Sequence, residues 1–484
     1  NVFNQYDLVQ RFKEGNQWPQ ATQRTKNLPR PVFNIIDMFI KNKRAAVLSQ
    51  SVSLQYTALV NGVGEKATTG AKIFTDFAKT VWEQCGQENL NIAVLDDAAT
   101  FGTGIIHYYY DFSLQMSTVK KSIGEIKGEI LNLKNIVFEN LNLNDLQKQR
   151  YIIICSEKEY SDVLALCLKR KTKKEQVLKI KSELTSFEND NQFKKSLVNI
   201  YTKYYKIGGE VFYDICTKNA VIAEKIPLSP AGKKPITLYP IAIMQWDLVK
   251  NSILGKGEAL SIIPNQKAIN FNYAMMLLSV QQTAWPKLIT KPGALQQSVT
   301  NEPGEHIVDF SANGNGISYL SPPVFSSFAI NLSDKILDVT RTVSGVPQAL
   351  TGESIGSNMA ASAIIALQAQ AKTPIAETQK RYWNFIKQIG KIWEQMFKAY
   401  VTYETVYNTD NNEISVLKGD DYSSMDFNLK VDVGPSSEYG ESLAQSTLEM
   451  LLAKGEISAK QYVMLAPDNI VPFRERLLKM WENN

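Results

Sequence analysis

The sequence predicts an α+β protein that is mainly helical. Three features favour this class: two apolar helical segments flanking a Pro- and Gly-rich insert at 286–325, strand-like segments between 105 and 226, and a long helical segment at 359–401. The chain has 484 residues, 44% hydrophobic and 21% charged, which is ordinary for a folded protein. At this length we expect two to four domains.

The first hundred residues are predicted to be helical. Apolar residues recur with a helical period over residues 32–51, 73–85 and 90–100. Pro29 and Pro31 mark a stop directly before the first of these helices. Gly102 and Gly104 break the third pattern, so we expect a change of structure there.

From residue 105 to about 226 the pattern becomes strand-like. Segments 105–110, 151–154 and 210–213 are rich in β-branched and aromatic residues. Charged segments at about 159–185 and 192–205 are predicted to be helices outside a small sheet. The first holds a basic run, Lys169 to Lys181, whose simplest interpretation is a solvated helix face.

Two helical segments of matched length then enclose the insert. Pro264 suits the opening turn of the first helix, and Pro286 stops it. The second carries an apolar stripe: Phe328, Leu332, Ile336, Val339 and Val343. Two such helices joined by a short insert pack most simply as an antiparallel pair. In the insert we expect strands at 287–290, 306–310 and 317–320.

The C-terminal part is predicted to be mainly helical. Residues 359–401 form a long helix that Pro374 should kink or interrupt. Apolar and polar residues alternate from Phe427 to Val433, which predicts a half-buried strand. Three short helices are expected to follow it.

The sequence offers few residues for catalysis. His107 and His306 are the two histidines and lie in different segments, so a zinc site or a histidine-activated nucleophile is poorly supplied. Asp96 and Asp97 could belong to a metal site, but adjacent helical residues diverge by about 100°. The segment Gly255-Lys256-Gly257 lacks the spacing of a phosphate-binding loop and is interpreted as a turn. We expect no enzyme, no metal and no cofactor.

Net charge, cysteine spacing and hydropathy bear on the partners and the compartment of the protein. A net charge of +5 neither demands nor excludes a polyanionic partner. The four cysteines lack a CxxC unit, which favours free thiols in a reducing compartment. No apolar run approaches the roughly twenty residues that span a bilayer, so no membrane is expected. The chain opens without Met, and we expect trimmed ends and a cytosolic site of synthesis.

The order of these parts resembles the portal proteins of tailed bacteriophages, over nearly the whole chain. Three groups of residues carry the resemblance. They are Gly15-Asn16-Gln17-Trp18 with Pro29-Arg30-Pro31 and Asn34; Gly345-Val346-Pro347 before Gly352 and Ser357-Asn358; and the strand 427–433 with Gly434-Pro435-Ser436-Ser437. The basic stretch 159–205 looks like an insertion that the resemblance does not cover.

The resemblance implies a ring of twelve copies at one capsid vertex, through which double-stranded DNA is packaged and later ejected. Terminase, the major capsid protein and a head–tail adaptor are the implied partners. The implied location is the virion, after assembly in the host cytoplasm. The implied parts are a wing (1–250), two stem helices (251–285 and 326–345), a clip (286–325), a tunnel loop (346–358) and a region with the long helix, return strand and crown (359–484).

The composition of the implied tunnel loop suits sliding DNA. Residues 346–358 contain no Lys or Arg, and each phosphate that such a residue neutralises would strengthen sequence-independent binding. We expect DNA to meet neutral side chains, one acid and a single stem lysine: Gln348, Thr351, Glu353, Ser354, Ser357, Asn358 and Lys335. In the clip, Trp285, Lys287 and Lys291 are expected to contact terminase or the adaptor, with packing at a β-edge as the alternative.

Two other functions stay open. One is a cytosolic scaffold that binds partners through amphipathic helices and has no pore; a stable monomer in light scattering would support it. The other is a metal-dependent nucleic-acid-processing enzyme that uses Asp96 and Asp97. Loss of a magnesium-dependent nuclease activity in Asp97→Ala would support that enzyme.

Overall fold

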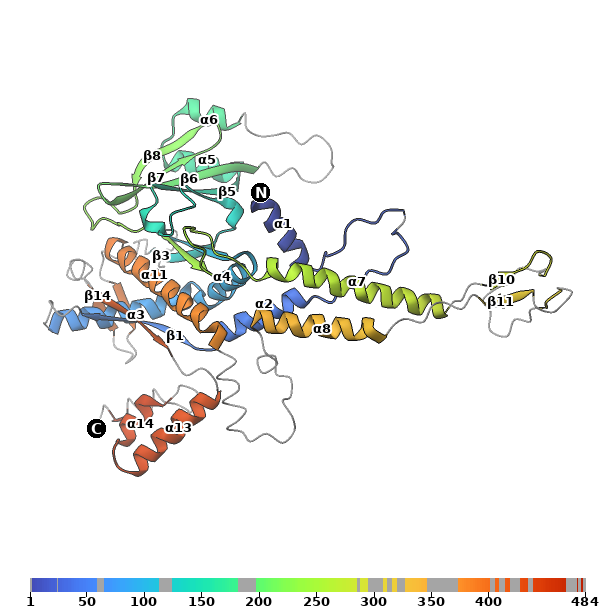
Figure 1. The fold of residues 1–484 in the computed structure, drawn as a ribbon. Helices are drawn as coiled ribbons and strands as arrows, with labels where there is room; N and C mark the ends of the chain where they lie inside the picture. The colour runs from blue at the N-terminus through green and yellow to red at the C-terminus, as the bar shows by residue number, and fades with distance from the viewer. Residues whose placement is uncertain are drawn as a thin grey trace. The chain divides into compact units, whose positions relative to one another are not determined.

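The computed structural model describes residues 2–23, 25–58, 65–112, 124–181, 197–284, 288–294, 308–310, 316–319, 327–345, 373–400, 405–408, 414–417, 427–433, 438–466, 477 and 480–481. Helices and strands both contribute along the chain (Figure 1), so the predicted mixed class is confirmed. The chain divides into two compact units. Residues 1–42 and 258–371 form the smaller unit, and residues 43–257 and 372–484 form the larger one.

The N-terminal hundred residues contain the predicted helices and one strand that was not predicted. The helices are α2 (Ile35–Val47), α3 (Glu65–Gln84) and α4 (Gln87–Phe101). The all-helical prediction is wrong at β1 (Val52–Ala58), which pairs antiparallel with β14 (Phe427–Val433). Leu54 and Tyr56 are buried and Ser53 and Gln55 are exposed, a two-residue alternation typical of a strand.

The β1–β14 pair packs against the long helix α11 (Ala376–Tyr400). Apolar residues recur along one side of this helix and are buried, from Tyr382 to Met396. Gly390 lets the helix approach the pair, because a Cβ there would lie 2.5 Å from a methyl carbon of Leu429. Pro374 lies in a short 3-10 turn, η4 (Thr373–Ile375), directly before α11. The expected helix at 359–372 lies outside the described residues.

A three-stranded sheet has the order β3-β2-β9, with β2 (Thr103–Asp111) between β3 (Glu125–Ile130) and β9 (Ile241–Gln245). The imidazole of His107 bonds through Nδ1 to Glu129 and through Nε2 to the Tyr204 hydroxyl, each at 2.9 Å. The hydrogen bond from His107 lowers the pKa of Glu129. With both ring nitrogens engaged, His107 links β2, β3 and β6 (Leu197–Ile207) as a structural residue.

A five-stranded antiparallel sheet follows, with the order β4-β5-β6-β7-β8. Its strands are β4 (Ile136–Phe138), β5 (Tyr151–Glu159), β6 (Leu197–Ile207), β7 (Glu210–Cys216) and β8 (Val221–Pro227). Two 3-10 turns, η2 (Leu133–Asn135) and η3 (Leu146–Lys148), precede β4 and β5. The prediction of a helix at 192–205 is wrong for residues 197–205, which belong to strand β6. The β-branched residues Val198 and Ile200 of this strand are buried in the core.

Further elements complete the larger unit. Helices α5 (Tyr160–Lys169) and α6 (Lys174–Lys181) confirm the first charged helical segment. A hairpin of β12 (Thr405–Asn408) and β13 (Ile414–Leu417) was not predicted. After the predicted strand β14, α13 (Glu438–Ala453) and α14 (Ala459–Leu465) provide two of the three expected terminal helices.

The smaller unit contains α1 (Val2–Lys13), α7 (Ala259–Ala284), β10 (Leu288–Thr290), β11 (Ile317–Tyr319) and α8 (Ser327–Ser344). The helices of the hairpin are not of matched length, since α7 has 26 residues and α8 has 18. The prediction that Pro264 lies in the opening turn is also wrong, because α7 begins five residues before it. The helix therefore continues past Pro264 without the backbone hydrogen bond that a proline cannot donate. Strands β10 and β11 pair, whereas residues 308–310 are not in a strand.

Backbone packing around Gly102 joins two distant segments of the larger unit. Gly102 ends α4 with φ of 99°, and a Cβ there would lie 2.2 Å from the Gly255 carbonyl oxygen. A Cβ at Gly257 would lie 2.5 Å from the carbonyl oxygen of Thr100. The Gly255-Lys256-Gly257 segment is therefore a site of close backbone approach, and the turn predicted there is replaced by a bridge between Lys256 and Asp247.

Alanine at Gly102 should destabilise the larger unit more than alanine at another left-handed glycine. Gly208 has φ of 59°, and a Cβ there would meet no atom within 4 Å, so Gly208→Ala should cost about 1 kcal/mol of backbone strain. Gly102→Ala adds overpacking against backbone and should cost about 3 kcal/mol or more. Chemical unfolding of the two variants measures the difference, and equal losses would contradict the close packing.

Candidate assembly site on the α7–α8 hairpin

The part of the chain that the structure describes offers no obvious catalytic centre. Within it, no three His, Cys, Asp or Glu side chains gather so as to hold a metal ion. Asp96 forms an ion pair with Arg44 of α2, which gives that carboxylate a structural role. None of the described helices is both long and apolar enough to cross a bilayer. The features that stand out are packing surfaces on the smaller unit.

A buried network of side-chain amides ties the N-terminal segment to α7. The Gln266 carbonyl oxygen accepts hydrogen bonds from the N–H groups of Ile35, at 2.9 Å, and Ile36, at 3.4 Å. Its amide nitrogen donates to the Phe33 carbonyl at 2.7 Å and to the Asn270 side chain at 2.9 Å. Gln266 is fully buried, so these four bonds replace the water that the side chain has lost.

The network continues into the N-terminal segment through two residues of the portal-like motifs. Asn270 donates to the Gln17 side chain at 2.6 Å, and Gln17 donates to the Asn34 side chain at 3.2 Å. Asn34 in turn donates to the carbonyl of Lys13, the last residue of α1. One face of α7 is thus occupied by the chain that follows α1.

A second face of α7 packs against α8 (Figure 1), and polar side chains bond across this contact. Asn265 donates to the Thr340 hydroxyl at 2.9 Å, and Asn272 donates to the Ser333 hydroxyl at 2.6 Å. Seven residues separate the two contacts on each helix and their order is reversed, which confirms the predicted antiparallel packing. Two polar layers about 10 Å apart fix the register of the pair.

Four of the five residues in the apolar stripe of α8 are exposed, and Ile336 is partly buried. Ser333 and Thr340 face α7 and are buried, whereas Leu332, Val339 and Val343 are 38%, 47% and 79% exposed. At 3.6 residues per turn the stripe lies about 100° round the helix from the α7 contact. The structure therefore leaves a row of large apolar side chains in solvent, on a helix that the glycine Gly345 ends with φ of 67°.

The outer face of α7 presents a second apolar surface. Phe271 is 59% exposed and borders a hollow of about 460 Å³. The Trp18 indole donates to the Pro31 carbonyl at 2.9 Å, which fixes its place in the wall of the hollow. Two cations, Arg11 and Lys267, lie at the same hollow. The ammonium of Lys267 lies 5.4 Å from the centre of the Phe12 ring, within cation–π range.

The predicted site residues fall in different places. Lys335 is exposed on α8, about 60° beyond the apolar stripe on the side away from α7, whereas Arg341 is partly buried near Asp338. Lys291 is exposed directly after β10, and its N–H donates to the Gly316 carbonyl at 2.8 Å. The remaining predicted residues lie outside the described residues: Trp285, Lys287, Gln348, Thr351, Glu353, Ser354, Ser357 and Asn358.

Sequence reasoning missed the amide network and the exposed face of α7. A usable signal was present, because an apolar helix that carries Asn265, Gln266, Asn270 and Asn272 must satisfy those amides somewhere. Their spacing falls into two pairs, seven residues and four residues apart, which indicates two polar contacts on different faces of one helix.

Removing the Gln266 side chain should release the N-terminal segment from α7. Gln266→Ala removes the acceptor of the Ile36 N–H and the donor to the side-chain carbonyl oxygen of Asn270, at a cost of about 1–3 kcal/mol for each buried group. The Ile35 N–H and the Phe33 carbonyl keep their bond to each other at 2.8 Å. Hydrogen exchange at residues 14–36 should accelerate. Gln10→Ala is the control, since Gln10 is exposed on α1 and bonds locally to Glu14. Equal exchange in both variants would contradict the network's role.

The comparison with family models identifies the fold group to which these features belong. A model described as phage P22-like portal protein matches residues 154–471, which include the α7–α8 hairpin, α11 and β14. The comparison with curated proteins found no match. Because the family model covers more than half of the chain, this protein belongs to the P22-like portal protein family of tailed phages.

Proposed function

We propose that the chain assembles as a portal ring at a capsid vertex and encloses a channel for double-stranded DNA. The observation that carries the proposal is the exposed stripe on α8, Leu332, Val339 and Val343, on a helix that packs within its own chain through polar residues. A neighbouring molecule that covers this stripe removes apolar area from water, which favours association. The family match supplies the kind of assembly.

A ring requires two different surfaces that meet between successive copies. We assign the α8 stripe of one copy to the outer face of α7 on the next, where Phe271 and the hollow beside it receive the apolar side chains. The two surfaces share no residue, so the contact is head-to-tail and closes only when a full circle is complete. A twofold dimer would instead need one self-complementary surface.

The parts of the chain take portal roles in this proposal. Helices α7 and α8 belong to the stem (251–285 and 326–345), β10 and β11 to the clip (286–325), residues 346–358 to the tunnel loop, and 1–250 and 359–484 to the wing and the crown region. Terminase and the head–tail adaptor meet the clip near Trp285, Lys287 and Lys291. The major capsid protein surrounds the ring, which places it in the virion. Lys335 and the loop, which has one acid and no Lys or Arg, face the DNA.

The alternatives make different predictions about mass. A pore-less scaffold would use the same apolar surfaces for other partners and stay a single chain of 54.4 kDa. Twelve copies give about 650 kDa, so light scattering with negative-stain images separates the two. The enzyme alternative is disfavoured by the Arg44–Asp96 ion pair, because a metal would have to displace the guanidinium.

Charges placed on the α8 stripe should prevent ring formation. Leu332→Lys with Val343→Lys puts two ammonium groups into an apolar contact, where desolvation is costly, so the protein should elute near 54.4 kDa. The matched control is Asp334→Lys, which makes the same +2 change on an exposed residue well away from the stripe and should still give rings. Rings from the double variant would contradict the proposed contact.

Cations in the tunnel loop should slow DNA without affecting assembly. Gln348→Lys with Ser354→Lys adds two phosphate-neutralising groups in every copy, so packaging should be hindered while the ring mass stays the same. The control replaces the same residues by neutral ones, Gln348→Asn with Ser354→Thr, and should package normally. A lysine variant that packages as fast as this control would show that the loop does not meet DNA.

A further inference from the structure

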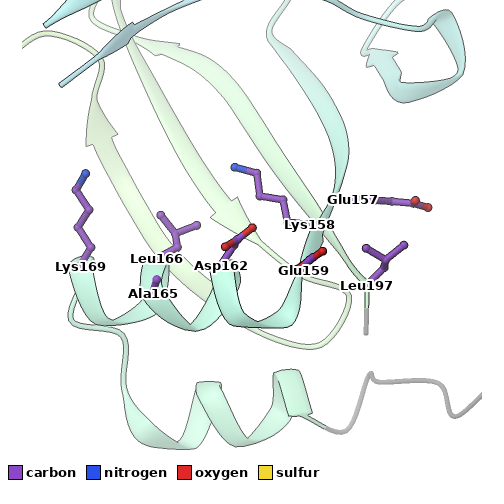
Figure 2. Close-up of a pocket in the computed structure, with 8 residues that line it drawn as sticks. All are labelled: Glu157, Lys158, Glu159, Asp162, Ala165, Leu166, Lys169 and Leu197. Carbon is purple, nitrogen blue, oxygen red and sulfur yellow. The ribbon is translucent and has the colours of Figure 1, made fainter. Parts of the chain in front are cut away.

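A basic turn projects from the larger unit between α5 and α6. Five of the six residues from 169 to 174 are cationic: Lys169, Arg170, Lys171, Lys173 and Lys174. All five are exposed. We name this segment the basic turn. Figure 2 shows Asp162 of α5 and the preceding Glu159 at one end of the helix and Lys169 at the other. Glu175, in the first turn of α6, is the acid that directly follows the basic turn.

The basic turn is held in place by contacts that leave its lysines outside. Thr172 donates from its hydroxyl to the Ile222 carbonyl of β8 at 2.9 Å, and its N–H donates to the Cys167 carbonyl at 2.9 Å. The Arg170 guanidinium donates to the Tyr213 hydroxyl of β7 at 2.7 Å. The inner sides of α5 and α6 pack on the sheet through an apolar cluster that includes Val163, Cys167 and Ile180.

Several features of the basic turn work against folding stability. Lys171 adopts the left-handed conformation, with φ of 54°, where glycine or asparagine would be less strained. Lys173 and Lys174 stand at the start of α6, where the helix dipole favours acids. Four lysines crowd within six positions and repel one another. None of them belongs to the apolar cluster, so packing does not explain their presence.

We propose that the basic turn binds the phosphate backbone of double-stranded DNA, through residues other than those assigned to the channel. Exposed cations spread over a rigid turn match a repeating array of phosphates and supply sequence-independent affinity through counterion release. The choice of DNA among polyanions rests on the proposed function, in which duplex DNA is what the ring handles. Anionic membrane fits less well, because α5 and α6 are short and their apolar residues Val163, Cys167 and Ile180 are buried on the sheet. This leaves two exposed leucines beside the turn, Leu168 and Leu178.

A closed DNA circle separates this surface from the channel. A small covalently closed duplex cannot thread a preassembled ring, so its binding reports contacts that form without threading. Binding is measured by fluorescence anisotropy across a salt series. The test variant changes four lysines to glutamine: Lys169→Gln, Lys171→Gln, Lys173→Gln and Lys174→Gln. The control makes the same charge change at four scattered exposed lysines: Lys72→Gln, Lys218→Gln, Lys250→Gln and Lys391→Gln.

The test variant should bind the circle about tenfold or more weakly, and the slope of log affinity against log salt should be smaller by about 3 to 4. The control should bind like the unmodified protein. The melting temperature of the test variant should be unchanged or higher, since crowded charges are relieved.

Three results would overturn the proposal: a circle that the unmodified protein does not bind, equal losses in test variant and control, or binding through these lysines to vesicles of anionic lipid but not to DNA. The mass of each sample measures ring formation independently of DNA binding. Binding of the circle can also be measured on the single chain. Failure of the portal proposal is therefore distinguishable from failure of this one.

Discussion

The polar contact between α7 and α8 is the constraint on which the assembly argument depends. Asn265 and Asn272 need partners at fixed distances, and Thr340 and Ser333 supply them. Directional bonds of this kind allow one register and one rotation of α8, whereas an apolar seam would tolerate several. Once the rotation is fixed, Leu332, Val339 and Val343 must point elsewhere. The exposed stripe is a consequence of that hydrogen-bonded seam.

Helix α7 is organised as three separate surfaces. Gln266 and Asn270 hold the N-terminal segment, Asn265 and Asn272 hold α8, and Phe271 faces outward. Polar groups make both contacts within the chain, and the apolar surfaces are left exposed. This division is compatible with the proposed ring, in which hydrogen bonds hold each subunit together and burial of apolar area favours association.

The sequence predicted elements with a long, regular pattern better than those whose identity depends on tertiary contacts. The helices α3, α4 and α11 and the strand β14 followed from periodicity. Strand β1 was missed because its alternation is short and lies among helices, and it depends on pairing with β14. Charged residues concealed β6, where Lys203 and Lys206 lie over the aromatic rings of Tyr151 and Tyr239.

The candidate site was only partly accessible to sequence reasoning. The stripe on α8 could be read from its spacing, but its exposure could not, because that depends on which side chains meet α7. The roles of Gln17 and Asn34 were likewise hidden, since the α7 residues that hold this segment lie more than two hundred residues away in the chain. The local sequence pattern identifies an apolar or polar face of a helix. Which segment covers that face depends on tertiary contacts with distant residues.

The separation between the two segments of the smaller unit also bears on biosynthesis. The Ile35 amide and its Gln266 acceptor are 231 residues apart, so the ribosome must make the intervening chain before this hydrogen bond forms. At about 5–20 residues per second, the N-terminal segment waits roughly 10–50 seconds. Since Gln17 and Trp18 help to form the hollow beside Phe271, this hollow is complete only after α7 has been made. In the proposed ring, subunits would therefore not associate through this surface while residues 43–257 are still being translated.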